Sequence, residues 1–137
     1  MAKKYRIVGI DEAGRGPLAG PVVAASVAIH EKFLPYKIND SKKISEKNRE
    51  IMYEKIIENA FNYGIGIVSA DIIDKINIHK ATLLAMKESY QELNYQNCMV
   101  YIDGIFKPDI IGNLNAIKHG DRLVPVISAA SIIAKVT

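Results

Sequence analysis

The segment from Tyr5 to Ser26, YRIVGIDEAGRGPLAGPVVAAS, places two adjacent carboxylates between two apolar runs. Residues 5–10 are mostly β-branched or aromatic, which is typical of a β-strand, and Asp11 and Glu12 follow where this strand ends. Two neighbouring acids at a strand tip repel each other unless a cation offsets their charge. The segment therefore predicts a divalent-metal site at the strand end, whereas an isolated acidic pair is more often a solvated turn.

The turn after the acidic pair holds an arginine between two glycines, Gly14, Arg15 and Gly16. Glycine permits unusual dihedral angles and close approach of the backbone, and a guanidinium group binds phosphates and hydroxyls. We therefore expect this turn to contact a phosphate or a sugar hydroxyl, although turn geometry alone would also explain the glycines. A dinucleotide-binding motif is excluded because the spacing from Gly14 through Gly16 to Gly20 is one residue too long and acids precede it.

The rest of the chain alternates between strand-like and helix-like segments. Besides residues 5–10, the segments of strand-like composition are 21–29, 62–70, 99–102 and 123–127. Apolar residues at helical spacing predict helices over 45–60, 78–93 and from 128 onward, with 71–77 as a connector. The first two strands are predicted to pair antiparallel, and Asp103 repeats the arrangement of a carboxylate at a strand end. The 137 residues therefore predict one α/β domain.

Four motifs, in this order, resemble the ribonuclease HII family. They are GIDEAGRGPLAGPVVAA at 9–25, DSKK at 40–43, YIDG at 101–104, and KHGD at 118–121 followed by SAASIIAKV at 128–136. The resemblance implies a fold of the ribonuclease H type, with a five-stranded mixed sheet flanked by helices, and residues 1–137 as the catalytic domain. It also implies that the first and fourth strands are neighbours.

The resemblance assigns the catalytic and metal-binding roles to four acids, Asp11, Glu12, Asp103 and Asp121. Asp121 comes 18 residues after Asp103, the spacing of this family, and is expected on the loop before the fifth strand. Four carboxylates suit Mg²⁺ or Mn²⁺ and not zinc, which prefers histidine or cysteine. Two such ions, roughly 3.5 to 4 Å apart, can hold a scissile phosphate for an in-line displacement.

The resemblance further implies an endoribonuclease that cleaves the RNA strand of RNA/DNA hybrids. It would also cut duplex DNA on the 5′ side of embedded ribonucleotides, a reaction of DNA repair, and leave a 3′-hydroxyl and a 5′-phosphate. The turn of Gly14, Arg15 and Gly16 would read the 2′-hydroxyl that distinguishes RNA from DNA. Residues Ser41, Lys42 and Lys43 would contact a phosphate, whereas a solvated surface is the other interpretation of the two lysines.

Composition limits where the protein acts and what else it binds. The single cysteine, Cys98, excludes an internal disulfide and a cysteine-based zinc site. The chain has no run of ~18 apolar residues and no secretory cleavage pattern, so we expect a cytoplasmic protein without membrane association. The formal net charge of +3 is compatible with a nucleic-acid partner but does not require one.

Two alternatives remain beside the nuclease. Related sequences continue with further helices after residues like those at 128–137, so we expect an exposed apolar patch, partial disorder near residue 137, or self-association. The alternative function is then a catalytically weak or inactive nucleic-acid-binding domain. A phosphoacceptor domain of the receiver type also places an acid pair after its first strand. It needs regular parallel β/α alternation, and the apolar run at 21–29 argues against that order.

Overall fold

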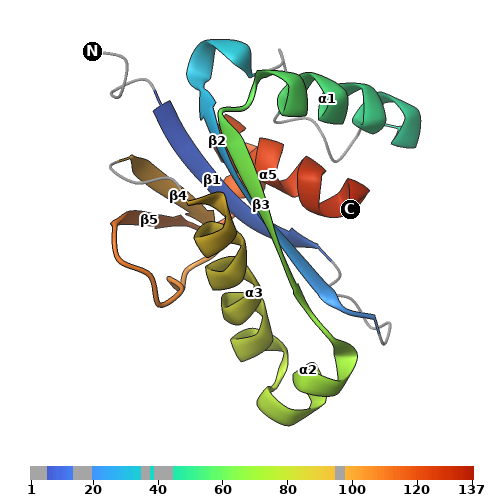
Figure 1. Ribbon diagram of the computed structural model, residues 1–137, viewed down its shortest axis with the longest axis vertical. Helices are drawn as coiled ribbons and strands as arrows, with labels where there is room; N and C mark the ends of the chain where they lie inside the picture. The colour runs from blue at the N-terminus through green and yellow to red at the C-terminus, as the bar shows by residue number, and fades with distance from the viewer. Residues whose placement is uncertain (1–5, 14–19, 35–37, 39–44, 95–97) are drawn as a thin grey trace.

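The computed structural model describes residues 6–13, 20–34, 38, 45–94 and 98–137, which form a sheet with helices on both faces (Figure 1). The strands are β1 (Arg6–Ala13), β2 (Val22–His30), β3 (Asn62–Val68), β4 (Met99–Asp103) and β5 (Asn113–Ile117). Their order is β3-β2-β1-β4-β5, with β1–β2 and β2–β3 antiparallel and β1–β4 and β4–β5 parallel. The predicted five-stranded mixed sheet is confirmed, and the antiparallel β1–β2 pair excludes a receiver-type domain.

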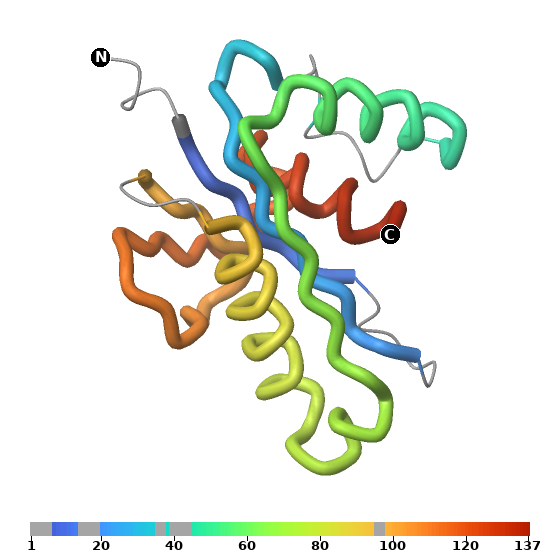
Figure 2. Tube along the Cα trace, viewed as in Figure 1, coloured from blue at the N-terminus to red at the C-terminus, as the bar shows by residue number. Residues whose placement is uncertain are grey.

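Helices cover both faces of the sheet. They are η2 (Glu31–Phe33), α1 (Glu46–Asn59), α2 (Ala70–Ile76), α3 (Ile78–Leu93), α4 (Gly120–Leu123) and α5 (Pro125–Val136). On one face α3 packs against β3, β2 and β1, and on the other α5 packs against β1 and β2. The tube in Figure 2 shows that α1 lies beside α5, whereas α2 and α3, which follow β3 in the chain, lie farther from α1. The sheet is therefore the middle layer of three.

Each face of the sheet has its own apolar core, because successive side chains of a strand point to opposite faces. In β1, Ile7 belongs to the cluster under α5, whereas Val8 and Ile10 belong to the cluster under α3. All three are almost completely buried. Burial on both faces explains why residues 7–10 of β1 and 22–29 of β2 are almost all apolar or small and do not alternate with polar residues.

The glycines of β3 allow α3 to lie directly on the strand. A Cβ atom at Gly64 would collide with the backbone oxygen of Ser89, and one at Gly66 with the backbone oxygen of Ala85. The hydroxyl groups of Ser26 and Ser89 are 2.7 Å apart and share a hydrogen bond in the same buried layer. The absence of side chains at these two positions therefore lets α3 approach β3 closely.

The predicted fifth strand is wrong. Residues 123–127 hold the end of α4 and the start of α5, and the strand that pairs with β4 is β5, Asn113–Ile117. Pro125 occupies the first turn of α5, where its missing N–H would have no helical partner and its fixed φ suits the helix. Of this run only Val126 and Ile127 are buried, as part of α5, and a short apolar segment of a buried helix is easily confused with a strand in sequence.

The connector predicted at 71–77 is also wrong, because Ala70–Ile76 is the helix α2. Its N-cap is Ser69, whose hydroxyl accepts a hydrogen bond from the backbone N–H of Ile72. The first predicted helix is confirmed as α1, and the hydroxyl of Ser45 caps it by accepting a hydrogen bond from the backbone N–H of Asn48. A seven-residue helix gives too short a pattern for periodicity to reveal it.

Candidate active site

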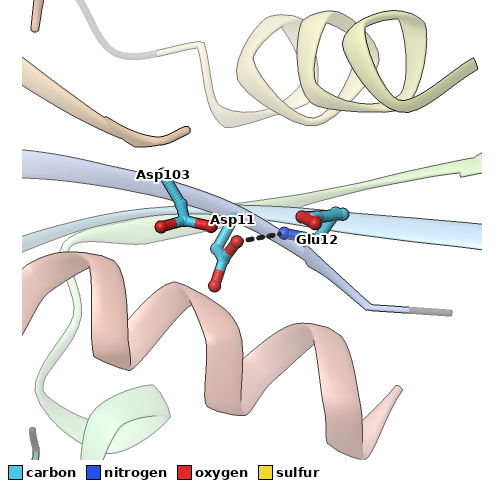
Figure 3. Close-up of side chains that lie close together, drawn as sticks. All are labelled: Asp11, Glu12 and Asp103. Atoms are coloured by element: carbon cyan, nitrogen blue, oxygen red, sulfur yellow. Dashed lines mark hydrogen bonds between the residues drawn. The ribbon is translucent and has the colours of Figure 1, made fainter. Parts of the chain in front are cut away.

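The end of β1 carries the first two acids on different faces. Asp11 lies in register with Ile7 and Gly9, which face α5, whereas Glu12 follows Val8 and Ile10, which face α3. The backbone N–H of Glu12 donates a hydrogen bond of 2.8 Å to Oδ1 of Asp11. β1 therefore presents one carboxylate from each face at its carboxyl end (Figure 3).

The third acid comes from β4, which runs parallel to β1. Ile10 is the partner of Ile102 in this pair, so the next residues, Asp11 and Asp103, lie side by side where both strands end. One carboxylate oxygen from each of Asp11, Glu12 and Asp103 lies within 4.8 Å of the others (Figure 3). We call these three residues the acidic cluster. The prediction that the first and fourth strands are neighbours is confirmed.

The acidic cluster holds more negative charge than a buried site tolerates alone. Asp11 is only 2% exposed. Burial raises the pKa of the Asp11 carboxyl well above its ordinary value, and the charges of Glu12 and Asp103 raise it further. A bound cation would favour the ionised carboxylates, and a donor set made only of carboxylate oxygens fits Mg²⁺ or Mn²⁺. The residues present therefore suit a hard divalent cation.

The raised pKa of Asp11 makes stability of the metal-free protein depend on pH. Above the ordinary value of 3.8, the unfolded chain loses the Asp11 proton while the folded chain keeps it. Stability should therefore fall as pH rises from this value through the raised pKa. Asp11→Asn removes this loss, so in EDTA its melting temperature should exceed that of the unmodified protein by a few degrees at pH 8 and by less at pH 4.

Thermal melts of the two proteins across this pH range, with EDTA or with Mn²⁺, measure the difference directly. Mn²⁺ should raise the melting temperature of the unmodified protein more than that of the variant, because the variant has lost one anionic ligand. A difference that stays constant from pH 4 to pH 8 in EDTA would contradict the account of Asp11.

The fourth predicted acid, Asp121, meets the acidic cluster through its backbone. Its N–H donates a hydrogen bond of 3.1 Å to Oδ1 of Asp103. Its carbonyl oxygen accepts one of 2.6 Å from the hydroxyl of Ser128 in α5. Asp121 lies on α4, after β5 and not before it as predicted, and its carboxylate is outside the group of mutually close ligand atoms found among the described residues.

The remaining predicted site residues lie outside the part of the chain that the structure describes. These are the turn residues Gly14, Arg15 and Gly16 and the segment Ser41, Lys42 and Lys43. Their assignment to substrate binding stays a prediction. The nearest described residues are Ala13 at the end of β1, Gly20 before β2, and Ser45 at the start of α1.

A cavity that the sequence did not predict adjoins the acidic cluster. It has a volume of about 350 Å³ and reaches from Asp103 to His79 and Met86 on α3, and to Phe106 and Lys118 on either side of β5. His79 is exposed near the start of α3, which Asn77 caps, and the centroid of its ring lies 4.5 Å from that of Phe106 in an edge-to-face contact. No spacing rule connects these segments, so only the fold reveals the cavity.

Comparison with known proteins agrees with this geometry. The family model described as Ribonuclease HII matches residues 8–137. The ribonuclease HII of Coxiella burnetii is 50% identical over 131 residues, and that of Caldicellulosiruptor bescii is 45% identical over 134 residues. The matches cover 96% and 97% of this chain, respectively, and 65% of each relative, so the chain spans just under two thirds of their length.

A solved structure shares the fold as well. The crystal structure of the ribonuclease H2 from Pyrococcus horikoshii OT3 superposes with a TM-score of 0.82 at 27% identity. The superposition covers 96% of this chain and 71% of that one. The five-stranded mixed sheet and the motifs in family order thus agree with an independent family match over most of the sequence. The chain belongs to the ribonuclease HII family.

Proposed function

We propose that this protein is a metal-dependent endoribonuclease that cleaves the RNA strand of RNA/DNA hybrids and cuts duplex DNA on the 5′ side of embedded ribonucleotides. The observation that carries the proposal is the acidic cluster, which a member of the ribonuclease HII family forms where β1 and β4 end side by side. A cluster of carboxylate oxygens can hold the hard cations of a phosphoryl-transfer site.

Each acid has a distinct part in this proposal. Asp11, Glu12 and Asp103 hold the cations, and Asp121, tied to Asp103 through its N–H, completes the ligand set from α4. Two bound Mg²⁺ or Mn²⁺ ions would supply an activated water and neutralise the charge on the leaving oxygen. The products are then a 3′-hydroxyl and a 5′-phosphate. α5 fixes the arrangement, because Ser128 holds the backbone of Asp121.

The direct test is a duplex that carries one ribonucleotide, incubated with the protein and Mn²⁺ or Mg²⁺. A nick on the 5′ side of the ribonucleotide, absent with EDTA and absent from an all-DNA duplex, supports the nuclease. Binding of the duplex without any nick would instead favour the alternative, a nucleic-acid-binding domain with little or no activity. A hybrid of RNA and DNA in the same assay shows which substrate is preferred.

Arg15→Ala tests the proposed reader of the 2′-hydroxyl. We expect the preference for a ribonucleotide over a deoxyribonucleotide to fall roughly 10-fold or more, as for loss of a hydrogen bond from a charged group. The affinity for Mn²⁺, measured by titration calorimetry, should change little. An equal loss of ribose preference and of metal affinity would contradict the role given to Arg15.

The place of action and the oligomeric state stay predictions. In the described part of the chain, no helix has the length and apolar character needed to cross a membrane. We propose a cytoplasmic protein that acts in DNA repair, as its substrate implies. Exposed apolar side chains such as Ile111 and Leu123 are candidates for self-association, which light scattering over a range of protein concentrations would reveal.

A further inference from the structure

The helix α4, which carries Asp121, is too short to hold its own position. It has four residues, and His119 before it adopts a left-handed backbone conformation, with φ of 59°, and makes no side-chain hydrogen bond to the helix start. Asp103 supplies that bond instead, because its Oδ1 accepts the N–H of Asp121 at 3.1 Å. The position of α4 and the orientation of one carboxylate in the acidic cluster therefore depend on each other.

The helix α5 holds the same residue of α4 through its carbonyl oxygen. The hydroxyl of Ser128 donates a hydrogen bond of 2.6 Å to the backbone oxygen of Asp121. It also lies 3.4 Å from the backbone oxygen of Val124, which already accepts the N–H groups of Ile127 and Ser128. The bond to Asp121 is therefore the stronger of the two. Ser128 is completely buried, so solvent water does not compete for this bond.

Close packing around Gly120 leaves α4 little room to move. A Cβ atom at Gly120 would collide with Cδ1 of Ile127 in α5 and would lie 3.6 Å from Oδ1 of Asp103 at the end of β4. Both Gly120 and Ile127 are buried. The start of α4 is thus enclosed between β4 and α5, and the hydrogen bond from Ser128 fixes its backbone within this space.

We propose that Ser128 is a positioning residue of the acidic cluster, which acts through the backbone of Asp121 on the carboxylate of Asp103. The inference rests on the proposed function, in which these acids hold Mg²⁺ or Mn²⁺. It assigns a part in metal binding to an uncharged residue that is completely buried in α5. The hydrogen-bond partners that orient metal ligands typically change metal affinity or activity 10- to 100-fold when they are removed.

Binding of Mn²⁺ to the protein without nucleic acid measures this role apart from cleavage. Electron paramagnetic resonance gives the concentration of free Mn²⁺ during a titration, and hence the affinity. Ser128→Ala should weaken this affinity about 10-fold or more. In the nicking assay it should raise the Mn²⁺ concentration for half-maximal rate by a similar factor. Its affinity for the duplex without divalent cations should stay within about twofold, because Ser128 is buried.

Ser89→Ala is the matched control for the loss of a buried hydroxyl. Ser89 is as completely buried as Ser128, and its hydroxyl also donates to a backbone oxygen, that of Met86, at 2.8 Å. It lies on α3, which covers the face of the sheet opposite to α5. Both alanine variants should melt at a lower temperature in EDTA. Only Ser128→Ala should lose affinity for Mn²⁺, so a loss of stability alone does not account for the expected result.

Ser128→Thr separates the hydroxyl from the packing of α5. It keeps the hydroxyl but adds a methyl group at a fully buried position, so it should also lower the melting temperature. Its affinity for Mn²⁺ should nevertheless stay within about threefold of the unmodified protein. Equal losses of affinity in Ser128→Thr and Ser128→Ala would show that packing of α5, and not the hydroxyl, sets the affinity, and would overturn the inference.

The outcomes distinguish the inference from the proposed function. If the protein nicks the duplex but Ser128→Ala binds Mn²⁺ as tightly as Ser89→Ala, the inference is overturned and the nuclease stands. If Ser128→Ala alone loses affinity for Mn²⁺ while no protein nicks the duplex, the positioning role is supported and the nuclease is overturned. A protein that neither binds Mn²⁺ nor nicks the duplex overturns both.

Discussion

Asp103→Asn is expected to lower kcat for nicking by several orders of magnitude and to leave the fold intact. Asp103 contributes one of the three carboxylates whose oxygens lie within 4.8 Å of one another, and an amide is a far weaker ligand for Mg²⁺ or Mn²⁺. The amide oxygen can still accept the N–H of Asp121, so α4 should stay in place. Single-turnover nicking with saturating Mn²⁺ measures the effect, and Asp11→Asn should match it.

A matched control exists a few residues away. Asp109 is fully exposed and its carboxylate makes an ion pair of 3.8 Å with Lys87, so Asp109→Asn changes the same charge outside the acidic cluster. This variant should keep its activity within about twofold, since exposed ion pairs contribute little. If Asp103→Asn lost activity only because its melting transition collapsed without metal, the catalytic assignment would fail. If the unmodified protein and Asp103→Asn both bound the duplex without nicking it, the alternative function, an inactive nucleic-acid-binding domain, would be supported.

The acidic cluster could largely be predicted because its members lie near the ends of apolar strands, Asp11 and Glu12 just before the last residue of β1 and Asp103 at the last residue of β4. Local composition marks the ends of β1 and β4, and with them Asp11, Glu12 and Asp103. β1 and β4 are neighbours although their paired residues Ile10 and Ile102 are 92 positions apart. Only the family resemblance supplied this long-range information. Composition alone leaves many strand orders open for five strands.

The prediction failed where local signals were short or shared by two structures. β5 reads NLNAI, with asparagines and half-exposed side chains, because it is an edge strand and buries little. The more apolar run at 123–127 was taken for the strand, but its buried residues, Val126 and Ile127, belong to α5, which packs against both the sheet and α1. The cavity lined by His79 and Phe106 depends on tertiary contacts alone, so no sequence pattern indicates it.

Gly9→Ala is expected to destabilise the protein strongly, because the added methyl group has no room between β1 and α5. A Cβ atom at Gly9 would collide with the backbone carbonyl of Val126 and lie 3.0 Å from the backbone nitrogen of Ile127. These atoms belong to the first turn of α5, which cannot move aside as a flexible side chain can. Overpacking of this kind costs about 3 kcal/mol, or roughly 10 °C in melting temperature for a domain of this size.

The collision should outweigh the ordinary benefit of replacing glycine in a strand interior by alanine, because that benefit is only about 0.5 to 1 kcal/mol. Gly9→Ala should therefore lower the free energy of unfolding. Gly20→Ala is the matched control, since a Cβ atom there meets nothing within 4 Å, and it should change stability by less than about 0.5 kcal/mol. Because α5 also holds the backbone of Asp121 through Ser128, any displaced α5 in Gly9→Ala should weaken Mn²⁺ binding in the folded protein. Equal melting temperatures for the two variants would mean that α5 does not depend on close contact with β1.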